Sequence, residues 1–396
     1  MKCRVLETIV CPSCKSSLRM RSFLELKDPH GQTDLNRGVD GGRPLCVDGC
    51  NVGSKDKCVE HEIIEGCLEC ACGGWYPIIN GVPRLLPEEL RHNFLEYYPN
   101  FFEKYGQKLP PLTESEASRL SKALEVKGKE DTIYRFSYEW NTYKDYEDNN
   151  FEKGLGYIDG NFLAGKMVLD AGCGAGRHAK EAVKRGAKEV FALDISNSVD
   201  AAFENTVAEP SIHVIQGDIF NLPFKDGTLD LIYSLWALPH THNPPEGFRG
   251  MSRHLREGGT IIVYLYSDRR KIAHRTLAAM RKVTLKMPNL AVNVIAFTLG
   301  TIDFSLCIQP YRILNRVKPL KRLLDRVTPT HIKLYAPRTF KTCRTDWLDR
   351  LFYPYVHYYS EKEVLDDWFK NTDLSETAVL SAGDYGMVVR GAVEKT

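Results

Sequence analysis

The chain has 396 residues, of which 43% are hydrophobic and 26% are charged, and its formal net charge is +2. This composition excludes a collagen-like or intrinsically disordered chain and allows one large globular domain with a smaller one beside it. The longest apolar run, Leu290 to Ile308, is interrupted by Asn293 and Asp303, so it falls short of the roughly 18 uninterrupted residues of a transmembrane helix. The first residues resemble no signal peptide, and we expect a cytoplasmic protein.

The first part of the chain is rich in cysteine, with nine of the twelve cysteines between Cys3 and Cys72. Cys11 and Cys14 form a Cys-x-x-Cys knuckle, and a second, tighter knuckle contains Cys70. Clustered pairs of this kind, without a secretory signal, favour metal binding over disulfides. Four thiolates around one Zn²⁺ would make a closed structural site that stabilises a small module.

The text around both knuckles resembles a known family. The segments LETIVCPSC (6–14) and GCLECACGGWYPIINGVPRLLP (66–87) are similar to the zinc-binding family of the eukaryotic tRNA methyltransferase activator subunit and its bacterial relatives. The resemblance covers both ends of a module at residues 1–87 and implies that the module supports or activates a methyltransferase. It implies the zinc ligands Cys11, Cys14, Cys70 and Cys72, with Cys67 as a substitute because Cys-x-x-Cys is the commoner second knuckle.

A segment rich in Gly and Asp, 28–57, separates the two knuckles and is typical of an inserted loop. It contains Cys46 and Cys50, and Cys58 follows it directly. These three thiols could hold a second zinc, and the alternative is that they are free thiols in a loop.

After a charged, aromatic connector and lid (88–150), residues 151–268 have the pattern of an α/β core. A short apolar strand, Met167–Leu169, leads directly into Asp170-Ala-Gly-Cys-Gly-Ala-Gly176 and then a helix over Arg177–Lys184. Glycines allow the backbone to approach a ligand, and the helix start offers free amides. Such a loop alone is equally compatible with a dinucleotide site.

The segments that follow discriminate between the two possibilities. Asp194 ends a second strand about twenty residues after the loop, where an acidic side chain can bind ribose hydroxyls. The ordered set VLDAGCGAG, ALDIS, QGDIFNLPF, LDLIYS and LREGGTIIVYLYS resembles the class I S-adenosylmethionine-dependent methyltransferases, of the type 11 kind, over residues 165–268. A dinucleotide dehydrogenase would account for only the first two segments.

The resemblance implies a fold and a site. The expected fold is a Rossmann-like, seven-stranded, mostly parallel sheet with helices on both faces, a small N-terminal zinc-binding domain and a helical insertion. The last antiparallel strands, Thr377–Leu380 and Met387–Ala392, come from residues 346–396. The implied S-adenosylmethionine-binding residues are Asp170 (methionine amino end), Gly172, Gly174 and Gly176 (turn beneath methionine and sugar), Asp194 (ribose), Ile195, Asp218 and Ile219 (adenine), and Ser234 (near the methyl donor).

Methyl transfer from a sulfonium needs mainly positioning and sometimes a base. His240 follows the fourth strand of the core, at the acceptor side, and His242 is the next candidate. His357 lies in a second candidate region, Trp347–Tyr359, whose aromatic residues could wall a substrate pocket or belong to the core. The alternative for each histidine is a purely structural role.

Residues 269–345 form a basic insertion with helical spacing of apolar residues, and we expect it to cover the acceptor side. Between Arg269 and Arg344 it has 17 Lys or Arg and only two acidic residues, Asp303 and Asp325. This charge suggests an anionic metabolite, an acidic membrane surface or nucleic acid as partner, and a solvated face is the alternative.

These observations favour an S-adenosylmethionine-dependent methyltransferase that acts on a small or carrier-linked, anionic metabolite. The covered acceptor side favours a small molecule over nucleic acid. The alternatives are an RNA or protein methyltransferase with a fused zinc activator domain and a non-catalytic scaffold that retains the fold.

Overall fold

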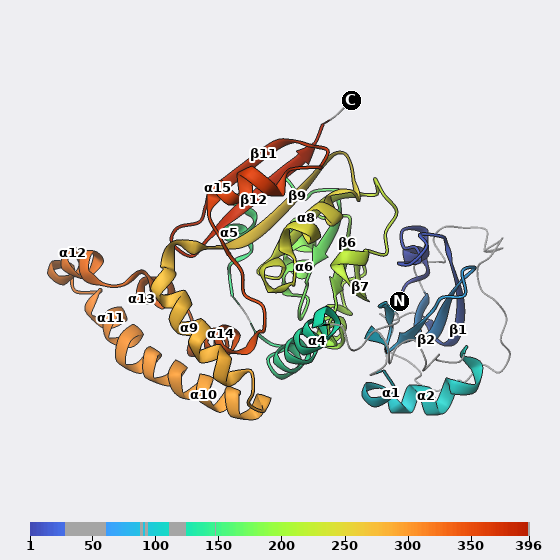
Figure 1. The fold of residues 1–396 in the computed structure, drawn as a ribbon, viewed down its shortest axis with the longest axis horizontal. Helices are drawn as coiled ribbons and strands as arrows, with labels where there is room; N and C mark the ends of the chain where they lie inside the picture. Colours follow the sequence, from blue (N-terminus) through green and yellow to red (C-terminus); the bar gives the residue numbers. More distant parts are fainter. Residues whose placement is uncertain (28–60, 88–89, 92–93, 111–123, 147, 395–396) are drawn as a thin grey trace.

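The computed structural model describes residues 1–27, 61–87, 90–91, 94–110, 124–146 and 148–394. The inserted segment 28–57 and its cysteines Cys46 and Cys50, together with Cys58, lie outside the described residues, and so does the second zinc site predicted there. Figure 1 shows a central sheet with a smaller β-rich module at one end and a helical arm at the other.

The core sheet confirms the predicted fold. Seven strands follow the order β7-β6-β5-β8-β9-β12-β11, and only β12 runs antiparallel to its neighbours. Their bounds are β5 Met167–Ala171, β6 Glu189–Asp194, β7 Ile212–Gly217, β8 Leu229–Leu235, β9 Leu255–Ser267, β11 Leu374–Ser381 and β12 Gly386–Val393, with the short β10 Tyr358–Tyr359 beside β9. The parallel strands are apolar and almost fully buried, as expected for a sheet that is covered on both faces.

Helices cover the two faces of this sheet and form two separate groups of buried apolar side chains. The first group lies under α8 (Pro244–Ser252) and η9 (Val364–Trp368), and includes Phe248 and Trp368. The second lies under α5 (Phe151–Leu155), α6 (Arg177–Lys184) and α7 (Ser198–Thr206). The remaining short elements of the core are η5 Ile219–Asn221, η6 Leu238–His240 and α15 Glu361–Glu363.

The N-terminal module extends the core sheet. After η1 (Cys3–Glu7), strands β1 (Leu18–Lys27), β2 (His61–Cys70), β3 (Trp75–Ile79) and β4 (Val82–Leu85) pair antiparallel in sequence order. Strand β4 then pairs parallel with β7, with Arg84 opposite Gln216. The module and the core therefore share one continuous sheet of hydrogen-bonded strands.

The connector forms helices on the edge of the molecule that carries the cofactor loop. They are α1 Phe94–Tyr97, α2 Pro99–Tyr105, η4 Gly106–Lys108 and the longer α4 Leu124–Thr142. Helix α4 packs against α7 and lies between the core and the arm in Figure 1.

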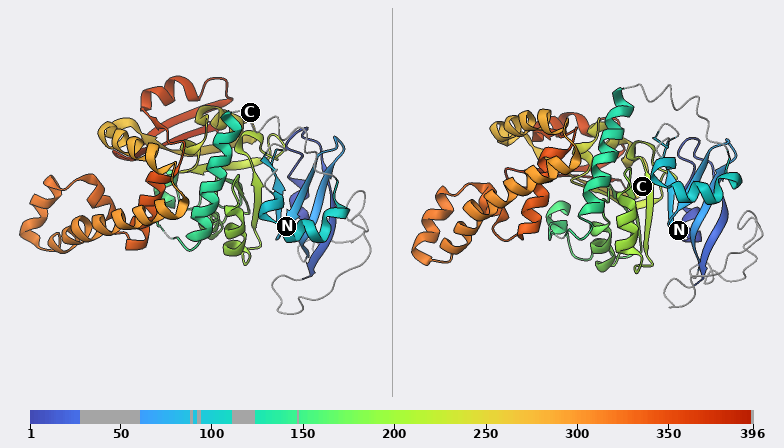
Figure 2. Two further views of the ribbon diagram at one scale, coloured as in Figure 1. Left: turned by 60° about the horizontal axis from the view of Figure 1, so that its bottom comes forward. Right: turned by 90° about the horizontal axis from the view of Figure 1, so that it is seen from below.

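The basic insertion is helical, as predicted, and forms an arm that projects from the core in both views of Figure 2. Its elements are η7 Asp268–Arg270, α9 Lys271–Thr284, α10 Asn289–Ile302, the π-helix η8 Asp303–Ile308, α11 Gln309–Leu314, α12 Lys318–Val327, α13 Thr330–Tyr335 and α14 Phe340–Phe352. Helix α10 packs along α14. Several apolar residues of its helices, among them Ile313, Leu314 and Leu320, are exposed rather than buried.

Candidate active site and cysteine cluster

The glycine-rich turn after β5 has a backbone that other residues would not adopt. Gly172, Gly174 and Gly176 all have positive φ, at 86°, 54° and 80°. A Cβ on Gly172 would lie 2.2 Å from the Cβ of Ala237, and one on Gly176 would lie 2.9 Å from Thr206. The turn is therefore both left-handed and tightly enclosed, which requires glycine.

Asp194 fastens this turn to the next strand. Its Oδ2 accepts a hydrogen bond from the Gly174 amide at 3.0 Å, and its Oδ1 accepts from the amide and hydroxyl of Ser196 at 2.9 and 2.7 Å. Burial raises the pKa of the Asp194 carboxyl, although these hydrogen bonds oppose the shift. The structure thus brings together two motifs that are about twenty residues apart in sequence.

Asp170 and Ser234 lie deeper, at the ends of the two central strands. Both are buried, and neither the Asp170 carboxylate nor the Ser234 hydroxyl has a hydrogen-bond partner among the described residues. Burial raises the pKa of Asp170 to about 8. The Tyr233 hydroxyl opposes this upward shift of the Asp170 pKa.

Asp218 follows β7 and carries the third predicted acidic contact. Its Oδ1 accepts from the amide of Phe220 at 3.0 Å, and its Oδ2 pairs with the Lys129 ammonium at 3.0 Å. Lys129 comes from α4, which the sequence patterns did not connect with the site. This ion pair joins α4 to the end of β7.

The glycine-rich turn, Asp194 and Asp218 lie in the wall of a cavity of about 300 Å³. Six of the nine predicted cofactor residues line it, namely Gly172, Gly174, Asp194, Ile195, Asp218 and Ile219. Asp170, Gly176 and Ser234 do not line it and support the wall from behind.

The far wall of the same cavity comes from α4 and from the arm. Four arginines of the arm, Arg270, Arg281, Arg338 and Arg350, lie in this wall. Aromatic side chains fill much of the remainder, including Phe136, Trp140, Trp236, Tyr266 and Tyr355. The insertion therefore forms part of the cavity wall opposite the glycine turn, and part of its positive charge faces inward.

His240 lies in the cavity wall with both ring nitrogens engaged. Its Nδ1 donates to the Tyr355 carbonyl at 3.0 Å, so its Nε2 accepts from the Tyr266 hydroxyl at 3.1 Å. Burial lowers the pKa of His240 to about 4, which keeps the ring neutral. A proton from the cavity could reach this ring through Tyr266. His242 also lines the cavity, whereas His357 does not, although both its neighbours Val356 and Tyr358 do.

The cavity wall also contains a group of carboxylates that no sequence motif predicts. Glu139 on α4 and Asp346 and Asp349 on α14 all line the cavity. Glu139 is buried with one oxygen unpartnered among the described residues, and burial raises its pKa well above the usual range. Burial, reinforced by Asp346, raises the pKa of Asp349 to about 7. A carboxyl of this kind can take up a proton near neutral pH.

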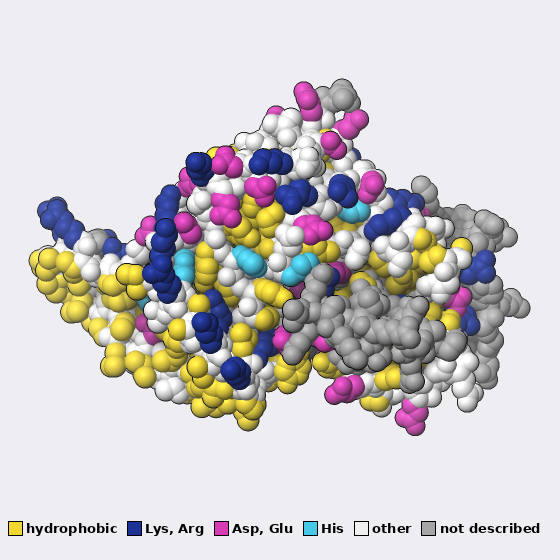
Figure 3. Space-filling view, viewed as in Figure 1, with side chains coloured by type: hydrophobic (Ala, Val, Ile, Leu, Met, Phe, Trp, Pro, Cys, Tyr) yellow, Lys and Arg dark blue, Asp and Glu magenta, His cyan; other side chains and the backbone are white. Residues whose placement is uncertain are grey.

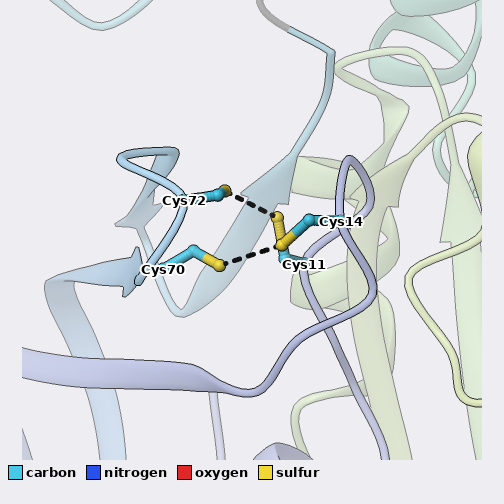
Figure 4. Close-up of side chains that lie close together, drawn as sticks. All are labelled: Cys11, Cys14, Cys70 and Cys72. Atoms are coloured by element: carbon cyan, nitrogen blue, oxygen red, sulfur yellow. Dashed lines mark hydrogen bonds between the residues drawn. The ribbon is translucent and has the colours of Figure 1, made fainter.

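The two knuckles of the N-terminal module converge on one point (Figure 4). The sulfurs of Cys11, Cys14, Cys70 and Cys72 all lie within 4.8 Å of one another, with Cys11–Cys72 at 3.8 Å and Cys14–Cys70 at 3.3 Å. A tetrahedral zinc site with Zn–S of about 2.3 Å spaces its sulfurs about 3.8 Å apart, so this geometry fits zinc. Cys67 is buried elsewhere, and its thiol contacts the Leu68 carbonyl.

Comparisons with known proteins give one family match for the core and another for the N-terminal module. Residues 169–263 match the family described as methyltransferase domain, and residues 2–81 match the Trm112p-like protein family. The chain contains a Trm112p-like domain fused to a methyltransferase domain. The methyltransferase domain belongs to the S-adenosylmethionine-dependent kind, in agreement with the predicted resemblance.

Individual relatives match over only part of this chain. The ribosomal protein arginine N-methyltransferase rmt3 of Schizosaccharomyces pombe is 34% identical over 138 residues, 33% of this chain and 25% of the relative. The malonyl-[acyl-carrier protein] O-methyltransferase of Pectobacterium atrosepticum is 35% identical over 106 residues, 26% of this chain and 40% of the relative. The chain thus spans less than half the length of these relatives.

A solved complex contains both kinds of domain as separate proteins. A chain from the complex between the Haloferax volcanii Trm112 methyltransferase activator and a methyltransferase is 22% identical, with a TM-score of 0.30, over 35% of this chain and 63% of that chain.

Arg84 links the Trm112p-like domain to the cofactor turn. This fully buried side chain donates to the Gln216 side-chain oxygen at 3.1 Å and pairs with Asp200 at 2.5 Å. Gln216 in turn donates to the carbonyl of Ile195 and the side chain of Asn197, at 3.1 and 2.9 Å. The segment after Asp194 is therefore held in place by a side chain of the Trm112p-like domain.

Proposed function

We propose that the chain transfers the methyl group of S-adenosylmethionine to a small or carrier-linked acceptor that bears an anionic group. The observation that carries this proposal is the single cavity that joins the predicted cofactor residues to a wall of arginines and aromatic rings. An enclosed, partly apolar cavity suits a small molecule, and guanidinium groups are suited to carboxylate or phosphate recognition.

The residues of the chain divide the work within this cavity. Bound S-adenosylmethionine would supply an activated methyl group. Asp194 and the turn at Gly172–Gly174 would hold the ribose and methionine portions, and Asp218 with Ile219 would hold the adenine. Where the acceptor must lose a proton, Asp349 and the pair of His240 with Tyr266 are the groups in the wall that can receive it.

We further propose that Cys11, Cys14, Cys70 and Cys72 hold a structural Zn²⁺. Four thiolates of this kind persist in a reducing compartment, which supports a cytoplasmic location. The zinc would stabilise the Trm112p-like domain, which has no side chain in the cavity wall among the described residues.

The alternative acceptor is RNA or protein. The Trm112p-like domain favours it, because its knuckle segments resemble the activator subunit of a tRNA methyltransferase. The cover formed by α4, α9 and α14 over the cavity favours the small acceptor instead, since an open groove would suit a polymer better.

One experiment tests the site and separates the acceptors. The Asp194→Asn variant should bind S-adenosylhomocysteine about 100-fold more weakly in calorimetry, because it loses charged hydrogen bonds to the ribose. Asp373→Asn, at an exposed carboxylate, should bind normally. Unchanged affinity of Asp194→Asn would contradict the site.

With a radiolabelled methyl donor and cell extract, label in the small-molecule or lipid fraction supports the proposal, and label in precipitated RNA or protein supports the alternative.

A further inference from the structure

The outer part of the arm is unusually apolar for an exposed structure. Within the described residues, one helical stretch is long and apolar enough to cross a membrane by length and composition: Asn289–Leu314, with 26 residues and an 18-residue window whose mean hydropathy is 1.8. Only 28% of its apolar window is buried. A core helix of a soluble protein would be mostly buried, so this stretch calls for a partner outside the chain.

Its exposed residues form a stripe. Leu290, Val294, Phe297, Ile302, Leu306 and Ile313 recur mostly at helical spacing, and Leu290 and Leu306 are 69% and 71% exposed. Figure 3 shows hydrophobic side chains gathered along the outer and lower edge of the arm, over α10 to α12. Contiguous exposed apolar surface of this kind marks an interaction site.

Helix α12 adds positive charge to this surface. Leu320, Leu323 and Val327 follow the i, i+3, i+7 spacing and are exposed on one face. Lys318, Lys321, Arg322 and Arg326 are exposed, and helical geometry places them on the opposite side. A basic amphipathic helix with an exposed apolar face is typical of proteins that bind membrane surfaces.

The inner face of the same stretch decides between lying on a membrane and spanning it. Val292 and Ala296 are buried, and at Gly300 the backbone of α10 comes so close to α14 that a Cβ would lie 3.0 Å from the Cα of Arg344. Helix α14 also contributes Asp346 and Asp349 to the water-accessible cavity. A spanning α10 would pull these charges into hydrocarbon, which is costly.

We propose that the arm is an interfacial anchor for a bilayer that contains anionic lipids. The apolar stripe of α10, η8 and α11, together with the apolar face of α12, lies in the boundary between headgroups and acyl chains. The basic side of α12 contacts anionic headgroups. The strong excess of Lys and Arg over acidic residues in the insertion makes the whole arm complementary to such a surface.

Co-sedimentation of the full chain with vesicles tests the anchor. Vesicles of phosphatidylcholine and phosphatidylglycerol in equal amounts should bind the protein, and vesicles of phosphatidylcholine alone should bind it much more weakly. Leu323→Glu and Leu306→Glu should each weaken binding by about tenfold or more. Each substitution removes an apolar side chain that the bilayer would bury between its headgroups and acyl chains. Lys321→Ala should weaken binding about fivefold.

Two matched variants control for general effects of charge. Leu365→Glu replaces a similarly exposed leucine on η9, with 53% exposure against 57% for Leu323. Lys188→Ala removes an exposed lysine of the methyltransferase domain. Both should bind vesicles like the unchanged protein. S-adenosylhomocysteine affinity, measured on the same preparations, should be unaltered by all five substitutions, so the anchor and the proposed catalysis can fail separately.

Four results would overturn the interfacial anchor. The first is no binding of the unchanged protein to anionic vesicles. The second is an equal loss in the Leu365→Glu control. The third is a dimer in light scattering that Leu323→Glu splits without any vesicle binding, since the apolar face would then belong to a second copy. Retention in the vesicle pellet after alkaline extraction would contradict an interfacial position and indicate a spanning helix.

Discussion

The Trm112p-like domain and the helical arm lie on opposite sides of the core, and they are attached in opposite ways (Figure 1). The Trm112p-like domain joins through backbone pairing of β4 with β7 and through the buried Arg84. The arm joins through side chains of α9, α10 and α14 that pack against α4 and the segment after it, and it leaves an apolar stripe exposed. The Trm112p-like domain is therefore part of the core sheet, whereas the arm leaves an apolar surface that is available to a partner outside the chain.

The difference matters for function. Because Arg84 reaches Gln216, and Gln216 holds the segment after Asp194, the Trm112p-like domain acts on the cofactor side of the cavity. The arm provides another part of the cavity wall through Arg281 and Asp349. Disrupting the first appendage should change cofactor binding, and disrupting the second should change what reaches the cavity.

The largest expected effect is at the cysteine cluster. Cys11→Ser should release the metal and destabilise the Trm112p-like domain by more than about 5 kcal/mol, since zinc binding supplies about 10–16 kcal/mol in small modules. Metal analysis and hydrogen exchange over residues 1–27 and 61–87 measure both effects. Cys307→Ser, at an exposed cysteine of the arm, is the matched control and should change neither. Full zinc content in Cys11→Ser would remove that residue from the ligand set.

A smaller effect is expected at Arg84. Arg84→Met keeps the length of the side chain but leaves the Asp200 carboxylate and the Gln216 side chain without their partner, which should lower the free energy of unfolding by about 3 kcal/mol. S-adenosylhomocysteine affinity should fall as well, because the segment after Asp194 loses support. Arg4→Met breaks a partly exposed pair with Glu189 and should cost less than about 1 kcal/mol. Equal losses in both variants would mean that the buried link contributes nothing special.

The smallest expected effects come from two glycine substitutions, and they have opposite signs in the arm and in the core. Gly300→Ala should destabilise the packing of α10 on α14 by about 1 kcal/mol, because the added methyl group meets the Arg344 backbone. Gly250→Ala, on α8 with open space around the added methyl, should stabilise its helix by up to about 1 kcal/mol. Hydrogen exchange in the two helices measures both changes. Stabilisation of α10 by Gly300→Ala would show that the arm is not packed as described.

Several parts of the molecule were predictable because they depend on local physics. The apolar strand before the glycine turn, the helix over Arg177–Lys184 and the final antiparallel pair follow from periodicity and from glycine's access to positive φ. The convergence of Cys11, Cys14, Cys70 and Cys72 also agrees with the predicted set. The metal itself and the cofactor residues remain predictions.

Other parts had no local signal. Nothing in the sequence connects Glu139 on α4 with Asp349 on α14, yet both line the cavity, because packing of distant elements brings them together. Lys129 faces Asp218 for the same reason. The helical spacing at Ile313 and Leu314 predicted an apolar face correctly, but periodicity cannot tell whether such a face meets the core or the outside.

The sequence by itself determined the order of the strands along the chain, the position of the glycine-rich turn and the two cysteine pairs, because each depends on residues that are near one another in the chain. Only the tertiary structure decided that β4 joins the core sheet, which carboxylates meet in the cavity, and which side of the arm stays exposed. Those features depend on which surfaces find each other when the chain folds, and contacts between distant residues leave no mark in local spacing.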